Sequence, residues 1–234
     1  MKSILKKSRT IVGLVQDLRF ARSAYRHRGR KAAIRSYLDQ AEKPCLHIGA
    51  GHAALPGWLS TDIASDDPNV VYLDAIKIFP MPDNSFEYIY CEHMIEHVPH
   101  DDASRMLQEC RRVLKPGGVL RVATPDLAFI LSLYNNHCED AKKYMEWMTA
   151  KYLPNQLEAR APFVINNAFR NWGHQFLYDA ATLEQSFRDA GFTEFVRERY
   201  HESQHAALRG IERHGINVGN EPIAMYETLI CEAS

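Results

Sequence analysis

The sequence predicts one α/β domain with a mainly parallel sheet, preceded by a basic helical arm. After Pro44, short apolar runs bounded by turn residues recur along the chain, as is typical of parallel strands covered on both faces. Segments with helical periodicity lie between the later runs. Residues 1–43 hold 12 lysines and arginines against 3 acidic residues, whereas residues 44–234 hold 16 against 26. The charge pattern therefore separates a basic arm, 1–43, from an acidic body, 44–234.

The predicted strands coincide with the apolar runs. They are 45–48, 58–63, 70–73, 86–91 and 119–124, with two late strands near 194–200 and 224–231. The connections after the first two strands, HAALPG and ASDDPN, are too short for full crossover helices. We therefore expect one face of the sheet to be trimmed at these two positions.

Helices are predicted where apolar residues recur every three or four positions. This pattern runs through 3–40 in the arm, through 101–114, which closes at KPGG, and through most of 127–153. A capped amphipathic helix follows Asp179 and ends at Gly191. Residues 160–178 are expected to be irregular, and the His-rich stretch 201–222 to be a surface loop or lid.

Composition limits the class of protein. The 234 residues, 46% of them apolar, suffice for one sizeable core. The five cysteines are scattered without a C-x-x-C pair, which predicts reduced, mostly buried thiols. No stretch approaches the roughly 18–20 apolar residues of a membrane-spanning helix. These features predict a cytoplasmic protein.

Polar or glycine residues follow four predicted strands in succession. Gly49 and Gly51 come after the first strand, Asp62 ends the second, Asp74 follows the third, and Glu92-His93 ends the fourth. Ligands of open α/β sheets bind at the carboxyl ends of strands, where glycines allow close backbone approach and a carboxylate can bind ribose hydroxyls. The joint pattern predicts a nucleotide-like ligand.

On these motifs the chain resembles the class I S-adenosylmethionine-dependent methyltransferases, most closely the small bacterial type-11-like branch often found beside polysaccharide genes. The resemblance covers about residues 44–232 and rests on LHIGAG, GWLSTDI, YLDA, FPMPDNSFEYIYCEHMIEHV, ECRRVLKPGGVLRVATPDL and TLEQSFRDAGF. It implies a Rossmann-like, seven-stranded, mostly parallel sheet whose last strand is antiparallel, with S-adenosyl-L-methionine as cofactor.

The resemblance also implies which residues hold the cofactor. It would lie over Gly49 and Gly51, with Asp62 on the ribose and Asp74 near the adenine. The predicted cofactor-binding set is His47, Gly49, Ala50, Gly51, Asp62, Ile63, Asp74, Ala75 and Glu92. Two positions depart from the family pattern, because His47 stands where an acidic residue is usual and Ala53 replaces a third glycine.

Four residues are predicted for catalysis. Glu92 and His93 would lie beside the sulfonium and the acceptor, and His97 would face the same cleft or pack its own short helix. His174, in the aromatic stretch FRNWGHQFLYD, falls on the expected acceptor side, and histidine can take a proton near neutral pH. The alternative for this stretch is an aromatic loop that packs on the sheet.

The segment CEHMIEHV also contains H-x-x-E-H, a zinc peptidase signature. A zinc hydrolase using His93, Glu96 and His97 is therefore one alternative function. That signature requires a helix around both histidines, and His93 follows directly on a predicted strand, so no metal site is expected.

The function predicted from the resemblance is O-methylation of a sugar in a glycan or lipid-linked precursor, a form of polysaccharide modification. The acceptor would be a small molecule or glycan. A second alternative is a non-catalytic cofactor-binding protein of the same fold. The arm, 1–43, would be a lid over the cofactor cleft or a surface helix in peripheral contact with anionic membrane lipid. Nucleic-acid binding is not expected, since no aromatic-basic module accompanies the charge.

Overall fold

The computed structural model describes residues 29–52, 54–135 and 138–234, together with Gly13, Asp17, Leu18, Ala21 and Tyr25. Most of the predicted 3–40 helix, and Ala53, lie outside the described residues. The end of that helix is present as α3, Arg30–Gln40. Among the described residues, no helix has the length and apolar character needed to cross a bilayer.

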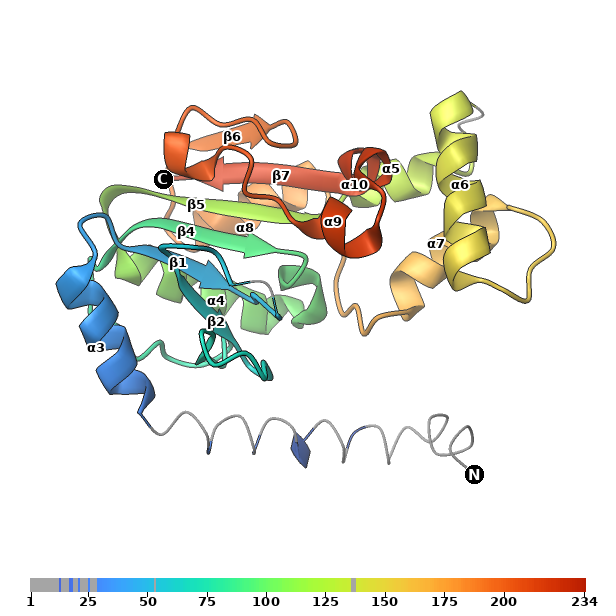
Figure 1. Ribbon diagram of the computed structural model, residues 1–234. Coiled ribbons are helices and arrows are strands. Elements are labelled where there is room, and N and C mark those ends of the chain that lie inside the picture. The colour runs from blue at the N-terminus through green and yellow to red at the C-terminus, as the bar shows by residue number, and fades with distance from the viewer. Residues whose placement is uncertain are drawn as a thin grey trace.

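Seven strands form one sheet in the order β3-β2-β1-β4-β5-β7-β6 (Figure 1). Neighbouring strands from β3 to β5 are parallel, whereas β7 runs antiparallel to both β5 and β6. The strands are β1 Cys45–Ile48, β2 Leu59–Asp62, β3 Val71–Tyr72, β4 Phe86–Glu92, β5 Leu114–Pro125, β6 Phe195–Glu198 and β7 Thr228–Ala233. The predicted Rossmann-like sheet with an antiparallel last strand is confirmed.

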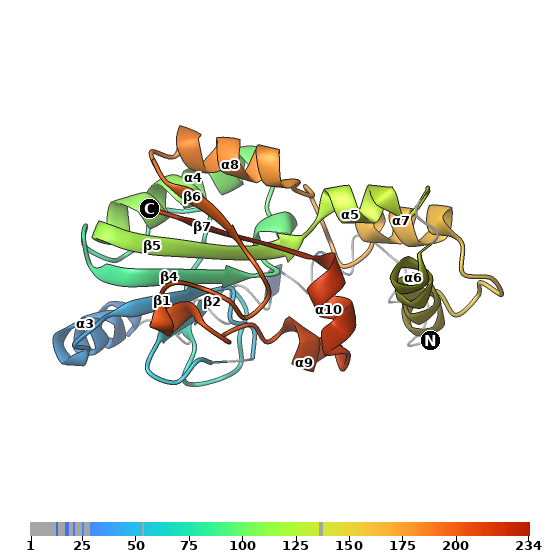
Figure 2. The same ribbon diagram turned by 90° about the horizontal axis from the view of Figure 1, so that it is seen from above.

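Helices cover one face of the sheet. Figure 2 shows α4, His100–Val113, and α8, Ala180–Asp189, together on this face. The buried residues of α4 repeat at helical spacing and join Leu46 and Ile48 of β1 in the main core. The side chain of Asp179 accepts a hydrogen bond at the start of α8, so the predicted cap is confirmed.

The opposite face is covered by α3 and by the segment that follows β6. Tyr37 of α3 donates a hydrogen bond to the carbonyl of Cys45 at 3.0 Å, which fixes the helix beside β1. The connections after β1 and β2 contain no helix among their described residues, as the short sequences predicted. The segment after β6 contains the short turn η2, Ala206–Leu208, and helix α9, His214–Val218.

Three helices extend beyond the carboxyl end of β5 (Figures 1 and 2). They are α5 Leu127–Ser132, α6 Glu139–Tyr152 and α7 Ala161–Arg170. Their facing side chains make a second small core that includes Tyr144, Met148 and Val164. This extension also forms one wall of a cavity at the carboxyl ends of the strands.

Two sequence predictions about the later chain were wrong. Residues 161–170, expected to be irregular, form α7, because Val164, Asn167 and Ala168 make a buried stripe against the neighbouring helices. The stretch 201–222 is no plain surface loop, since it contains η2, α9 and the start of α10, Glu221–Glu227. Helix α10 also delays β7, which begins at Thr228 rather than near 224.

A buried ion cluster attaches this segment to the sheet. Arg121 of β5 is fully buried, and its guanidinium pairs with Glu212 and Glu232, each at 2.6 Å. His201 contacts the second carboxylate oxygen of Glu212 at 2.9 Å and Glu221 at 2.8 Å. Burial opposes the charged form of His201, but these two carboxylates outweigh burial and raise its pKa. The acidic groups around Arg121 thus favour the protonated form of His201.

Substitution of Glu212 should show how strongly the cluster stabilises the fold. Because Glu212→Gln leaves Arg121 buried with one charged partner fewer, we expect the free energy of unfolding to fall by about 3 kcal/mol. The control is Glu184→Gln, which removes the exposed partner of Arg188 and should cost less than about 1 kcal/mol. Urea denaturation measures both, and equal losses would contradict the role of the buried cluster.

Candidate functional site

Two cavities lie at the carboxyl ends of the central strands, where the order of the strands along the sheet reverses between the parallel neighbours β1 and β4. The first cavity, about 330 Å³, is lined by the Gly49–His52 loop, by Glu92 and His93 after β4, and by residues of α9. The second cavity, about 360 Å³, lies between η1 (Ile95–His97), the helical extension and α10. His93 and His214 line both cavities.

The loop after β1 is shaped for close backbone approach to the first cavity. Gly49 has φ +74°, and a Cβ there would lie 2.5 Å from Cγ of Met94. Gly51 has φ +55°, and its Cα faces open space. The carboxylate of Asp62 accepts a hydrogen bond from the Gly51 amide at 2.9 Å and another from Ala64 at 2.7 Å. Asp62 therefore holds the glycine loop in place.

His47 lines the first cavity and has a buried ring nitrogen without a hydrogen-bond partner among the described residues. Its ring is almost fully buried against Tyr90, with ring centroids 5.3 Å apart, and burial lowers the pKa of His47 to about 4. The ring is thus neutral, and its Nδ1 atom has no hydrogen-bond partner among the described residues. Unpaired buried polar atoms are costly, so a ligand group that pairs with Nδ1 would be favoured.

The remaining residues of the predicted cofactor set lie at the ends of β2 and β3. Ile63 follows β2, and Asp74 and Ala75 follow β3, on the same edge of the sheet as the glycine loop. Asp74 accepts a 3.4 Å hydrogen bond from the Ile76 amide and pairs with Lys77 at 3.2 Å. Ile63, Asp74 and Ala75 do not line the first cavity.

Glu92 is used in a way that the sequence did not indicate. Its carboxylate accepts hydrogen bonds from the backbone amides of Arg213 at 2.9 Å and 3.0 Å and of His214 at 2.9 Å. The residue that ends β4 therefore fixes the start of α9, from which His214 and Asn217 reach the first cavity. A contact between residues so far apart in the chain leaves no local sequence signal.

His93 forms the boundary between the two cavities. It has φ +45°, an uncommon conformation for a residue with a side chain, and its ring stacks on His214 with centroids 3.6 Å apart. Its Nδ1 atom lies 3.3 Å from Oε1 of Glu96. Burial opposes the charged form of His93, but Glu96 and, further off, Glu227 and Glu92 outweigh burial and raise its pKa.

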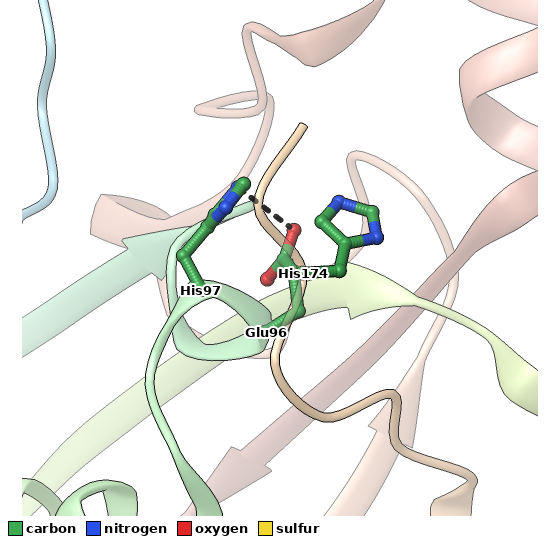
Figure 3. A group of neighbouring side chains, drawn as sticks. All are labelled: Glu96, His97 and His174. Carbon is green, nitrogen blue, oxygen red and sulfur yellow. Dashed lines mark ion pairs between the residues drawn. The ribbon is translucent and has the colours of Figure 1, made fainter. Parts of the chain in front are cut away.

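The floor of the second cavity brings Glu96, His97 and His174 together (Figure 3). Glu96 is fully buried. Its Oε2 atom accepts a hydrogen bond from the hydroxyl of Thr124 at 3.1 Å. Its Oε1 atom has no hydrogen-bond partner among the described residues. Nε2 of His97 lies 4.0 Å from that Oε1. Burial acts to raise the pKa of Glu96, but the neighbouring His93 and His97 outweigh it and leave the pKa below its ordinary value.

The backbone explains how His174 reaches this floor from a distant part of the chain. The carbonyl of Glu96 accepts hydrogen bonds from the amides of Gln175 at 2.7 Å and Phe176 at 3.2 Å. The ring of His174 lies edge-on to His97, with centroids 4.9 Å apart, and its Nδ1 is 2.7 Å from the carbonyl of Ala168. Because a carbonyl only accepts, Nδ1 carries the proton and Nε2 is left with a free lone pair.

Aromatic side chains form the walls of the second cavity. Tyr144, Trp147 and Tyr152 come from α6, and Trp172 from the turn after α7. Tyr152 meets Trp172 and Trp147 edge-on, with centroids 5.0 Å and 5.6 Å apart. Trp172 has φ +55°, so the backbone is strained where it places this ring. The aromatic stretch around His174 indicated Trp172, whereas the three rings from α6 were missed.

The helix required by the zinc peptidase signature does not form around His93 and His97. His93 ends the strand region, and η1 is a three-residue 3-10 turn, so the two histidines do not share a helix face. The close group is instead Glu96, His97 and His174, and His93 approaches the same Oε1 atom of Glu96 at 3.3 Å. The zinc hydrolase alternative thus lacks the helix that it requires, although Nε2 of His97 lies 4.0 Å from Oε1 of Glu96.

Part of this chain is similar to a known protein family. The sequence model for a family described as "Methyltransferase domain" matches residues 46–122. The predicted resemblance to the class I methyltransferases is confirmed. The methyltransferase match includes Gly49, Asp62 and Glu92 and ends before His174, and it supports S-adenosylmethionine as the cofactor.

The matches to individual methyltransferases are either short or of low sequence identity. A "probable methyltransferase ltbC" of Aspergillus luteorubrus is 48% identical over 40 residues, which is 17% of this chain and 14% of that protein. A SAM-dependent methyltransferase structure from Archaeoglobus fulgidus is 16% identical over 87% of this chain and 91% of that one, with TM-score 0.46. A possible histamine N-methyltransferase from Thermotoga maritima is 17% identical over 92% and 96%, with TM-score 0.44. Similarities this low assign neither a substrate nor a mechanism to this chain.

Substitution of Glu92 should loosen α9 without unfolding the domain. Glu92→Gln replaces one accepting oxygen by an amide that cannot accept from Arg213 or His214. Because hydrogen bonds to charged groups contribute about 1.5–3 kcal/mol, exchange of these two amides should accelerate at least about tenfold. Hydrogen exchange measures this, with Glu202→Gln, an exposed glutamate of the same segment, as control. Unchanged protection at Arg213 and His214 would contradict the role given to Glu92.

Proposed function

We propose that the protein transfers the methyl group of S-adenosylmethionine to a hydroxyl group held in the second cavity. The observation that carries this proposal is the pair of adjoining cavities at the carboxyl ends of β1 and β4, which share His93 and His214. The family match covers the Gly49–His52 loop and the end of β4 at the first cavity, and it does not include α9. When bound, the cofactor supplies an electrophilic methyl group on a sulfonium.

The first cavity has features that fit this cofactor. The open space at Gly51 admits a ligand against the backbone, and the unpaired Nδ1 of the neutral His47 can accept a hydrogen bond from a ligand amine. Asp62 holds the Gly51 amide, so the loop is already ordered. Gly49, Ala50, Gly51 and His47 would therefore hold the cofactor, with Asp62 on the ribose and Asp74 near the adenine as further assignments.

On the acceptor side, His174 is the side chain that we propose to take the proton of the hydroxyl. The hydrogen bond from Nδ1 to Ala168 fixes the ring and leaves Nε2 free to accept. Burial lowers the pKa of His174, despite an opposing contribution from Glu96, so the ring is neutral near neutral pH. His93, with its raised pKa, is less suited to this role.

The proposed acceptor is a sugar in a glycan or lipid-linked precursor, so that the protein modifies a polysaccharide. The aromatic walls of Tyr144, Trp147, Tyr152 and Trp172 support this choice, since flat rings pack well on the apolar faces of sugars while polar groups remain at the floor. The family branch that the sequence resembles supports it as well. Labelled cofactor with a panel of sugars and glycans is the direct test, and binding without transfer would favour the non-catalytic alternative.

Cofactor binding can be tested before any acceptor is known. We expect the parent protein to bind S-adenosylmethionine and Asp62→Ala to bind it more weakly by about 1–3 kcal/mol, because charge-assisted bonds to ribose and to Gly51 are lost. Asp67→Ala, which removes a carboxylate from the connection between β2 and β3, is the control. Calorimetry that finds no binding by the parent protein would sink the proposal, and equal affinities would remove Asp62 from the site.

The role of His174 can be separated from binding. His174→Ala should lower turnover by about 10²–10⁴-fold, the usual contribution of a general base, and leave cofactor affinity nearly unchanged. His205→Ala, which removes a histidine from outside both cavities, should keep parental turnover. If His174→Ala also keeps parental turnover with the true acceptor, this histidine has no part in the reaction.

A further inference from the structure

We propose that Glu96, His97 and His174 bind one divalent transition-metal cation at the floor of the second cavity. One ligand atom from each residue lies within 4.8 Å of the other two. Figure 3 shows the Glu96 carboxylate between the two imidazole rings. Two imidazoles and one carboxylate form a common ligand set for zinc in catalytic sites and for non-haem iron.

The first support is the fully buried Oε1 atom of Glu96. Its side chain has 0% exposure, and its Oε1 makes no hydrogen bond among the described residues, although His93 and His97 lie 3.3 Å and 4.0 Å away. A buried carboxylate oxygen without a hydrogen bond is costly unless a charge compensates it. His93 lies 3.3 Å from this oxygen and compensates part of its charge, and a cation between Glu96 and the rings of His97 and His174 would supply the rest.

The second support is the orientation of His174. Histidines that bind metals usually donate the proton of their other ring nitrogen to a carbonyl or carboxylate, which fixes the tautomer and the ring. His174 does this through Nδ1 and Ala168 at 2.7 Å. The hydrogen bond from Gln175 to the carbonyl of Glu96 holds the backbone of the two ligands together.

To bind one ion, the ligand atoms of the three side chains must move closer together. Ligand atoms about 2.1 Å from a tetrahedral ion lie about 3.4 Å from each other, so the present spread must shrink by up to about 1.4 Å. His97, with 36% of its side chain exposed, can make this movement by rotation. The cavity of about 360 Å³ leaves a fourth position open to water or to a substrate oxygen.

Cation binding is a property separate from the proposed methyl transfer, and it can be measured without any methyl transfer. It also departs from the sequence expectation of no metal site, and its third ligand is His174 rather than His93. With the cation bound, Nε2 of His174 is a ligand, and a hydroxyl at the open position gives up its proton to solvent more readily. His174 then acts as a base only in the cation-free protein.

Calorimetric titration of metal-free protein with Zn²⁺ tests the site, and Mg²⁺, which prefers oxygen ligands, is the comparison. We expect one Zn²⁺ per chain and no comparable binding of Mg²⁺. His97→Ala and His174→Ala should each weaken Zn²⁺ binding at least about 100-fold, since loss of a mere supporting partner already costs about 10–100-fold. His205→Ala is the matched control and should bind as the parent does.

The outcomes are distinct. Glu96→Gln also tests the site, but Glu96 is buried and this variant can fail to fold. His97 is partly exposed, so His97→Ala should fold and gives a result in that case. No Zn²⁺ binding by the parent, or Zn²⁺ binding by both histidine variants as tight as that of the parent, overturns the site and leaves the proposed methyl transfer standing. Zn²⁺ binding by a protein that binds no S-adenosylmethionine supports the site and rejects the proposed function.

Discussion

The burial of one carboxylate, that of Glu96, organises the site. It lies in η1, the turn that follows β4, and its side chain is fully buried, so its charge must be balanced by groups brought from elsewhere. Thr124 of β5 donates to it, and His93 approaches it from the end of β4. Its own backbone carbonyl binds the amides of Gln175 and Phe176, which delivers His174 to the same place. Removal of this charge would affect both cavities through His93.

The sheet was predictable because each strand is identified by its own residues and the turn residues beside it. The apolar run of Leu46, His47 and Ile48 and the glycines after it identify β1 and its ligand end without reference to any other part of the chain. The capped helix α8 is likewise recorded in Asp179 and its successors. Helix α7 was missed because its Asn-rich sequence has weak propensity, and its apolar stripe becomes apparent only against α5 and α6.

The site was predictable only in part, for the same physical reason. Residues at strand ends were found because strand ends are local features, but their partners are distant in sequence. Nothing near Glu92 indicates that it will accept from Arg213 and His214, and nothing near Glu96 indicates that His174 will lie beside it. The signal that could have suggested the first partnership is the histidine content of 201–214, which is equally typical of a surface loop.

The boundary between the cavities sets a condition on any transfer between them. His93 and His214 stack at 3.6 Å, and both rings face both cavities. A reacting group must therefore pass beside this pair. His93 is held by its φ of +45° and by Thr228 at 3.3 Å, whereas His214 belongs to a five-residue helix whose first amides rest on Glu92. The ring of His214 is held as well, since its Nε2 lies 3.0 Å from Oε1 of Glu227. The hydrogen bonds of Glu92 hold the start of α9, from which His214 reaches both cavities, so a residue at the end of β4 positions a side chain of the second cavity without lining that cavity.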